Sequence, residues 1–86
     1  MSRRDKRLRR FLAGPADHGF EEMSRLLKDL GYEEIRSGRT SGSRVAFFNK
    51  TRGHIIRLHK PHPGNIMKKY QMELIKEALK AKGMIE

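Results

Sequence analysis

Residues 44–59, RVAFFNKTRGHIIRLH, decide the fold of this chain. RVAFFN (44–49) and HIIRLH (54–59) are short runs rich in β-branched and aromatic residues, and the KTRG between them is typical of a hairpin connection. Because side chains alternate along a strand, one face of this hairpin is apolar. We expect the core face to carry Val45, Phe47, Ile56 and Leu58, and the outer face to carry Arg44, Phe48, Arg57 and His59.

A helix is predicted on each side of the hairpin. Residues 18–30 place apolar side chains at helical spacing, with Asp17 as the N-cap and Gly31 as the stop. On the other side, the connector Lys60–Gly64 (KPHPG) can form neither a helix nor a central strand, because of its two prolines. A second helix is then predicted over Ile66–Lys82, capped by Asn65 and ended by Gly83. We expect its apolar stripe to contain Met67, Tyr70, Leu74, Ala78 and Ala81, with Ile75 and Leu79 beside it.

A third strand, Tyr32–Ser37, is predicted before the turn cluster GRTSGS (38–43). The order α-β-β-β-α predicts a two-layer α+β domain over residues 17–86, in which two helices cover one face of a three-stranded antiparallel sheet. Residues 1–16 are predicted to form a basic N-terminal arm. The arm includes a short apolar stripe that Gly14 and Pro15 would end, and the sequence leaves open whether it docks on the domain.

Length and composition exclude several classes of protein. A chain of 86 residues builds one small core, so a large enzyme with its own cofactor fold is excluded. The chain has no cysteine, which removes disulfides, thiolate nucleophiles and cysteine-based zinc sites. No apolar run approaches the roughly 20 residues that span a bilayer, and no apolar stretch of a secretory signal follows the basic start. The absence of cysteine is compatible with the cytoplasm without proving it, and we expect a cytoplasmic protein with no cofactor, no metal and no membrane partner.

The formal net charge of +10 is unevenly distributed along the chain. Residues 35–69 contain nine Lys and Arg and no Asp or Glu, whereas residues 17–34 contain six acidic and two basic residues. A localised basic field of this kind attracts a polyanion, although a solvated lysine-rich face remains the alternative. The predicted nucleic-acid-binding residues are Arg39, Arg44, Lys50, Arg52, Arg57, Lys60, Lys68 and Lys69.

Four motifs, in this order, resemble the HicA-type toxins of bacterial toxin–antitoxin modules. They are LLKDLGY (26–32), TSGSRVAF (40–47), IRLHKPHPGN (56–65) and LKAKGMI (79–85), and the match covers residues 20–85. The resemblance implies a fold like that of double-stranded-RNA-binding domains. It also implies a ribosome-independent mRNA interferase that cleaves single-stranded mRNA and is held inactive by a cognate HicB-type antitoxin.

The chain departs from the family at one position. In the family a catalytic histidine follows the Gly-Ser turn by one or two positions, but here Gly42-Ser43 is followed by Arg44 and Val45. That catalytic role is therefore not transferred to this chain. The histidine that closes the third strand is present as His59, and His62 lies three positions later.

The residues themselves are suited to cleaving RNA without a metal ion. Such cleavage needs a base for the 2′-OH proton, an acid for the leaving 5′ oxygen and cations for the phosphate. Imidazole suits both proton transfers and Arg suits the phosphate, so His59 and His62 are the predicted catalytic residues, with Arg44 and Arg57 as the phosphate clamp.

Other interpretations stay open. His59 could be a strand-end residue that bonds the connector, and His62 could be a loop residue that caps the backbone or contacts the antitoxin. His59 and His62 lack a third ligand for a metal, and His18 and His54 are interpreted as structural. At the level of function, the alternatives to a nuclease are a non-catalytic RNA-binding module of the same fold and a basic protein whose partner is an acidic protein.

Overall fold

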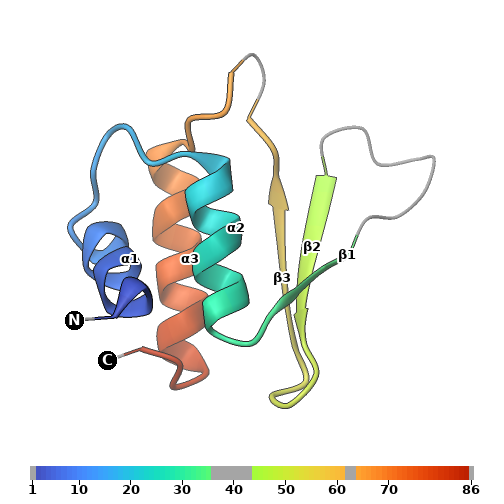
Figure 1. Ribbon diagram of the computed structural model, residues 1–86. Coiled ribbons are helices and arrows are strands. Elements are labelled where there is room, and N and C mark those ends of the chain that lie inside the picture. The colour runs from blue at the N-terminus through green and yellow to red at the C-terminus, as the bar shows by residue number, and fades with distance from the viewer. Residues whose placement is uncertain (1, 36–43, 62–63, 86) are drawn as a thin grey trace.

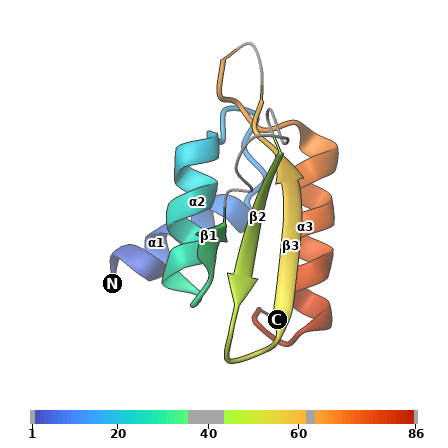
Figure 2. The same ribbon diagram turned by 90° about the vertical axis from the view of Figure 1, so that its right-hand side faces the viewer.

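The computed structural model describes residues 2–35, 44–61 and 64–85, which form three helices and one sheet (Figure 1). The elements are α1 (Arg3–Leu12), α2 (Phe20–Asp29), β1 (Glu33–Ile35), β2 (Arg44–Asn49), β3 (His54–His59) and α3 (Lys69–Ala81). The strands form an antiparallel sheet in the order β1-β2-β3, and α2 and α3 both lie on one face of it (Figure 2). This confirms the predicted two-layer α+β fold. None of the helices in the described ranges is long and apolar enough to span a membrane.

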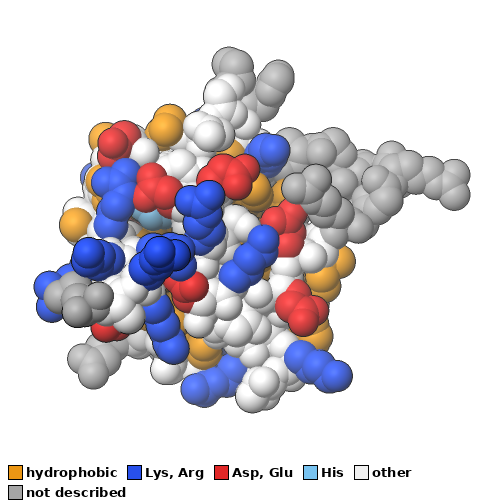
Figure 3. Space-filling model, viewed as in Figure 1, with side chains coloured by type: hydrophobic (Ala, Val, Ile, Leu, Met, Phe, Trp, Pro, Cys, Tyr) orange, Lys and Arg blue, Asp and Glu red, His pale blue; other side chains and the backbone are white. Residues whose placement is uncertain are grey.

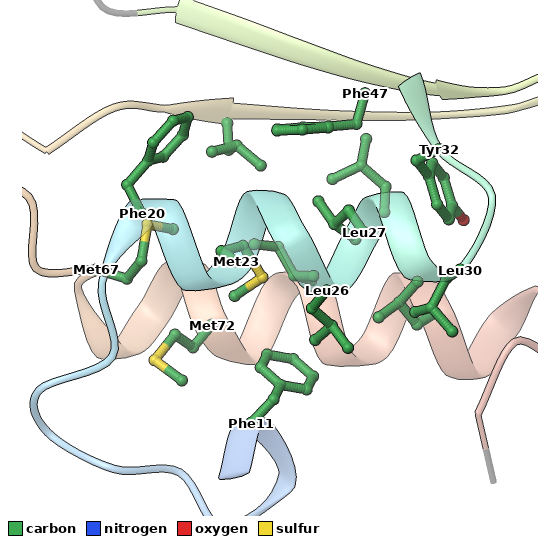
Figure 4. Close-up of a cluster of buried hydrophobic side chains, with 14 of the residues drawn as sticks. Phe11, Phe20, Met23, Leu26, Leu27, Leu30, Tyr32, Phe47, Met67 and Met72 are labelled. Atoms are coloured by element: carbon green, nitrogen blue, oxygen red, sulfur yellow. The ribbon is translucent and has the colours of Figure 1, made fainter. Parts of the chain in front are cut away.

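The β2–β3 hairpin forms with the predicted bounds and the predicted faces. Val45, Phe47, Ile56 and Leu58 are buried under the helices, each with 9% or less of its surface exposed. They complete a core whose other members come mainly from α2 and α3 (Figure 4). The strict alternation of the two runs is sufficient to set both the strands and their buried face.

The first predicted strand begins one residue later in the structure. β1 begins at Glu33 because the backbone N–H of Tyr32 donates to the carbonyl of Leu27 at 2.9 Å and so belongs to the end of α2. Gly31 adopts φ +95°, as predicted for the glycine that ends this helix. Residues 36 and 37 of the predicted strand, and the turn cluster 38–43, lie outside the described residues.

The predicted caps of both core helices were wrong. The N-cap of α2 is Gly19, and Asp17 instead pairs with Arg10 at 3.1 Å. α3 begins at Lys69 and is not capped by Asn65. The cause is shared: residues 65–67 run extended beside 18–20, with the Phe20 N–H donating to the Asn65 carbonyl at 2.7 Å and the Met67 N–H donating to the His18 carbonyl at 2.8 Å.

The buried face of α3 also differs from the prediction. Its buried residues are Gln71, Met72, Ile75 and Leu79. Two members of the predicted stripe, Tyr70 and Leu74, are 57% and 64% exposed. The prediction counted Met67 as part of the helix, whereas Met67 lies in the extended segment before it. The buried face is therefore rotated by about one residue, which is roughly 100° on an α-helix.

The N-terminal helix α1 packs on the core helices. Phe11 is 2% exposed, and its ring points from α1 toward the core helices (Figure 4). Arg7 donates two hydrogen bonds to the Asp29 carboxylate, and Arg10 bonds both Asp17 and Glu22. Acidic residues on α2 thus neutralise part of the basic charge of α1.

Candidate nucleic-acid interface

The outward face of the sheet carries its cations at one end. Arg44, the first residue of β2, lies directly opposite His59, the last residue of β3, and Arg57 lies opposite Ala46 in the next row. All three of Arg44, Arg57 and His59 are exposed. Side chains directly opposite each other across two strands have Cβ atoms about 5 Å apart, and diagonal neighbours lie about 7–8 Å apart. We call this group the Arg44–His59 end of the sheet.

The His59 backbone is held by a side chain of α3. The Gln71 Oε1 accepts from the His59 N–H at 3.0 Å, and the Gln71 Nε2 donates to the His59 carbonyl at 3.2 Å. Because Gln71 uses both backbone groups, they point away from β2, and Arg44 and His59 form a non-hydrogen-bonded pair. Such pairs bring opposite side chains closest together, with Cα atoms about 4.5 Å apart.

The rest of the outward face is mainly apolar. Ile35 and Ile55 are 44% and 42% exposed, and Phe48 and Ala46 are half-buried. Glu33 pairs with Phe48 in the row farthest from Arg44 and His59, so the acid on this face lies at the opposite end from the cations. A polyanion on this face would therefore meet cations at one end and an apolar surface in the middle.

Three further predicted binding residues belong to the same end of the molecule. Lys60 follows His59, but its ammonium group lies 5.6 Å from the centre of the Phe20 ring, at the start of α2. Lys68 is the N-cap of α3, and Lys69 is its first residue. Lys69 lines a groove between the 11–16 segment and α3, so it does not join the outward face of the sheet.

The structure separates Lys50 and Arg52 from the Arg44–His59 end. Both lie in the hairpin that joins β2 to β3, and Arg52 donates to the Lys82 carbonyl at the end of α3. At about 3.3 Å per residue, the six residues of β2 place this hairpin roughly 17 Å or more from Arg44. Arg39 and His62 lie outside the described residues.

Two histidines have local partners of their own and are not part of the Arg44–His59 end of the sheet. His54 Nδ1 lies 2.7 Å from the Tyr32 hydroxyl, and burial, followed by the charge of Lys82, lowers the pKa of His54. His18 is 1% exposed and its ring meets the Phe11 ring edge-on, and burial lowers its pKa as well. These contacts agree with the structural role that the sequence suggested for both residues.

The side of the molecule formed by α1 and α2 mixes both signs of charge. Figure 3 shows Lys and Arg interspersed with Asp and Glu on this side. The ion pairs of Arg7 and Arg10 with α2 and its preceding loop account for part of this pattern. Interspersed charges largely cancel beyond a Debye length, so this side attracts a polyanion less than the sheet end does.

The Arg44–His59 end combines an imidazole with two guanidinium groups. Guanidinium groups bind phosphate oxygens through paired donors, and imidazole can accept or donate a proton near neutral pH. Among the described residues, no group of three His, Asp or Glu side chains is arranged to hold a metal ion. The described side chains of the Arg44–His59 end can therefore bind a phosphate and transfer one proton next to it.

Sequence reasoning missed Gln71. The available signal was its position four residues before Ile75, which places a polar side chain on the buried face of a helix. A buried amide needs hydrogen-bond partners, and the ends of strands are a common source of them.

One comparison with known proteins agrees with the resemblance seen in the motifs. A family model described as "HicA toxin of bacterial toxin-antitoxin" matches residues 20–83. No curated protein sequence and no solved structure matches the chain. The family match covers α2, the sheet and α3, and it begins after α1.

Proposed function

The chain belongs to the HicA toxin family of bacterial toxin–antitoxin systems, and from this premise we propose that it is an mRNA interferase. In this proposal it cleaves mRNA in the bacterial cytoplasm without a metal ion, and a cognate antitoxin neutralises it. The observation that carries the proposal is the pairing of Arg44 with His59 on an exposed sheet face, with Arg57 in the next row.

In the proposed reaction, His59 moves a proton at the scissile phosphate. It either takes the proton of the 2′-OH as that oxygen attacks phosphorus, or gives a proton to the 5′ oxygen as the bond to it breaks. Arg44 and Arg57 bind the phosphate oxygens and stabilise the charge that develops on them. The products are then a 2′,3′-cyclic phosphate and a free 5′ hydroxyl.

The second proton transfer needs another group, because a guanidinium group binds phosphate as a hydrogen-bond donor and does not serve as an acid or base. The family places a histidine near this position, and the substitution makes Arg44 a phosphate ligand here. We assign the second transfer to His62, three residues after His59 in the chain. Lys60, Lys68, Lys69 and Arg39 are proposed as further phosphate contacts. Lys50 and Arg52 would contact only an RNA long enough to cross the sheet.

Purified protein incubated with a defined mRNA in excess EDTA tests the proposal. We expect fragments that end in a 2′,3′-cyclic phosphate, and no cleavage of the same RNA made with 2′-O-methyl groups. Cleavage that stops in EDTA, or that leaves 5′ phosphates, would rule out this mechanism.

A non-catalytic RNA-binding module is the second candidate, favoured by the arginine at the position after the Gly-Ser turn. This alternative predicts that the protein binds the mRNA without cleaving it, so that no new RNA ends appear under any condition. A protein that recognises only an acidic partner would show neither cleavage nor strong RNA binding.

A further inference from the structure

The outer edge of β3 has backbone groups that the sheet does not use. β3 is an edge strand, and the bonds of Gln71 show that the N–H and C=O of His59 point away from β2. Since these directions alternate along a strand, the N–H and C=O of Arg57 and Ile55 point to the same edge. No described residue bonds these groups from that side.

An exposed apolar row on α3 runs beside this edge. Leu74 follows Gln71 by three residues and therefore lies on the same flank of α3. Figure 2 shows α3 beside the outer edge of β3. Tyr70 and Leu74 form one continuous apolar patch bordered by Lys69, Glu73 and Glu77, and Ala78 is half-buried one turn farther on. We call Tyr70, Leu74 and Ala78 the α3 row.

The edge and the row match in length. α3 and β3 are antiparallel, so α3 followed forward from Gln71 and β3 followed backward from His59 extend in the same direction (Figure 1). From Gln71 to Ala78 the helix advances about 10 Å, at 1.5 Å per residue. From His59 to Ile55 the strand covers about 13 Å, at 3.3 Å per residue. The free groups of Arg57 and Ile55 therefore fall within the length of α3 that the α3 row covers.

We propose that the antitoxin docks here by adding an extended segment to β3 as a fourth strand. Its backbone would bond the free groups of Ile55 and Arg57, in the mode by which extended peptides join open sheet edges. Alternate side chains of the added strand would pack on the α3 row and must be apolar. The remaining side chains would lie on the outward face beside Arg57 and His59 and must be acidic.

Charge selects this occupant over a second copy of the chain. Each copy carries a net charge of +10, so two copies repel, whereas an acidic strand neutralises the cations beside it. The position also explains inhibition, because a strand next to β3 would place its acidic side chains where RNA phosphates would bind. The inference rests on family membership and does not require that the protein cleaves RNA.

Backbone amide hydrogen exchange tests the edge. In the free protein we expect the amides of Ile55 and Arg57 to exchange rapidly, and those of Ile56 and Leu58, which bond β2, to exchange slowly. In the complex with the product of the adjacent reading frame, co-expressed with this chain, exchange at Ile55 and Arg57 should slow at least tenfold. Unchanged exchange at these two amides in the complex would overturn the proposal.

Two matched variants test the α3 row. Leu74→Glu should raise the Kd for the same antitoxin at least tenfold, whereas Leu12→Glu, at an exposed leucine of α1, should change it less than twofold. RNA cleavage or RNA binding by Leu74→Glu should equal that of the wild type, so loss of antitoxin binding is separable from loss of function. Equal Kd values for Leu74→Glu and wild type would contradict the proposal. So would light scattering that shows a dimer of the chain alone which Leu74→Glu dissociates, because a second copy would then be the occupant.

Discussion

The side chain of Gln71 fixes the position of the His59 backbone. It is 6% exposed and satisfies both backbone groups of the last residue of an edge strand. Without it, the end of β3 would be held only by the pairing of Leu58 with Val45 and by the connector. The residue at the centre of the proposed chemistry thus depends on one amide from another element.

Replacing the Gln71 amide should show whether it affects the position of His59 separately from the binding of RNA. Gln71→Met fills the same space but leaves the His59 N–H and C=O without partners, so the free energy of unfolding should fall by about 1–3 kcal/mol. We expect kcat for RNA cleavage to fall while KM changes little, because Arg44 and Arg57 remain in place. Gln71→Glu keeps the acceptor for the N–H and should restore part of kcat. A loss of stability with unchanged kcat would show that Gln71 has a structural role alone.

His18 should make the protein less stable in mild acid. Burial lowers its pKa below 6.5 in the folded state, so the unfolded chain binds more protons as the pH falls. Its stabilising contribution is complete above pH 6.5 and is lost as the pH falls from there toward the lower folded pKa. The melting temperature of wild type should therefore drop between pH 7 and pH 5, and that of His18→Phe should drop less. Parallel curves for the two proteins would contradict this role for His18.

At the scale of elements, the sequence predicted what depends on local pattern. β2, β3 and the end of α2 at Gly31 follow from alternation and from a glycine that accepts positive φ. The starts of α2 and α3 could not be predicted, because they depend on the pairing of residues 65–67 with 18–20, which are far apart in the chain. The wrong start then rotated the predicted face of α3.

In the candidate site too, the features that depend on local pattern could be predicted and those that depend on distant contacts could not. The strand alternation placed Arg44, Arg57 and His59 on one face, and the four-residue connection set the register that pairs Arg44 with His59. Lys50 and Arg44 are both predicted binding residues, but they lie at opposite ends of β2, because neighbours in the sequence can occupy opposite ends of one strand. Gln71 could not be assigned its partner, since that contact depends on how α3 packs beside β3.

The docking of α1 can be tested at two adjacent residues. Phe11 is 2% exposed and Leu12 is 38% exposed, so only Phe11→Ala removes a buried side chain. We expect Phe11→Ala to lower the free energy of unfolding by about 3 kcal/mol, the low end for a buried phenylalanine because α1 can detach. Leu12→Ala should cost much less. Denaturant unfolding measures both, and equal losses would mean that α1 does not pack as described.

The surface of the whole molecule has one region where opposite charges pair and another where cations are unpaired among the described residues. On the side of α1 and α2, Arg7 and Arg10 pair with acids, whereas Arg44 and Arg57 have no acidic partner among the described residues. Judged from the net charge of +10 alone, the positive potential on the side of α1 and α2 would be overestimated. The potential at the Arg44–His59 end would be underestimated. The two surfaces should respond differently when one arginine is removed.

The salt dependence of RNA binding measures that difference. Each phosphate contact with single-stranded RNA contributes about 0.7 to the slope of log K against log salt. Arg44→Gln should reduce the slope by about this amount. Arg7→Gln, which removes the same charge from the pair with Asp29, should leave the slope unchanged. Equal reductions in both variants would mean that RNA responds to net charge and not to the sheet end.

RNA cleavage by His59→Ala, compared with His54→Ala at the other end of the same strand, tests whether His59 takes part in the reaction. Loss of a group that transfers a proton typically costs 10²–10⁴ in rate, so His59→Ala should lose at least about 100-fold in EDTA while its circular dichroism spectrum stays that of wild type. His54→Ala loses the hydrogen bond to Tyr32 and should melt at a lower temperature but keep its cleavage rate. If folded His59→Ala cleaves RNA at the wild-type rate, the Arg44–His59 end of the sheet is not the catalytic site.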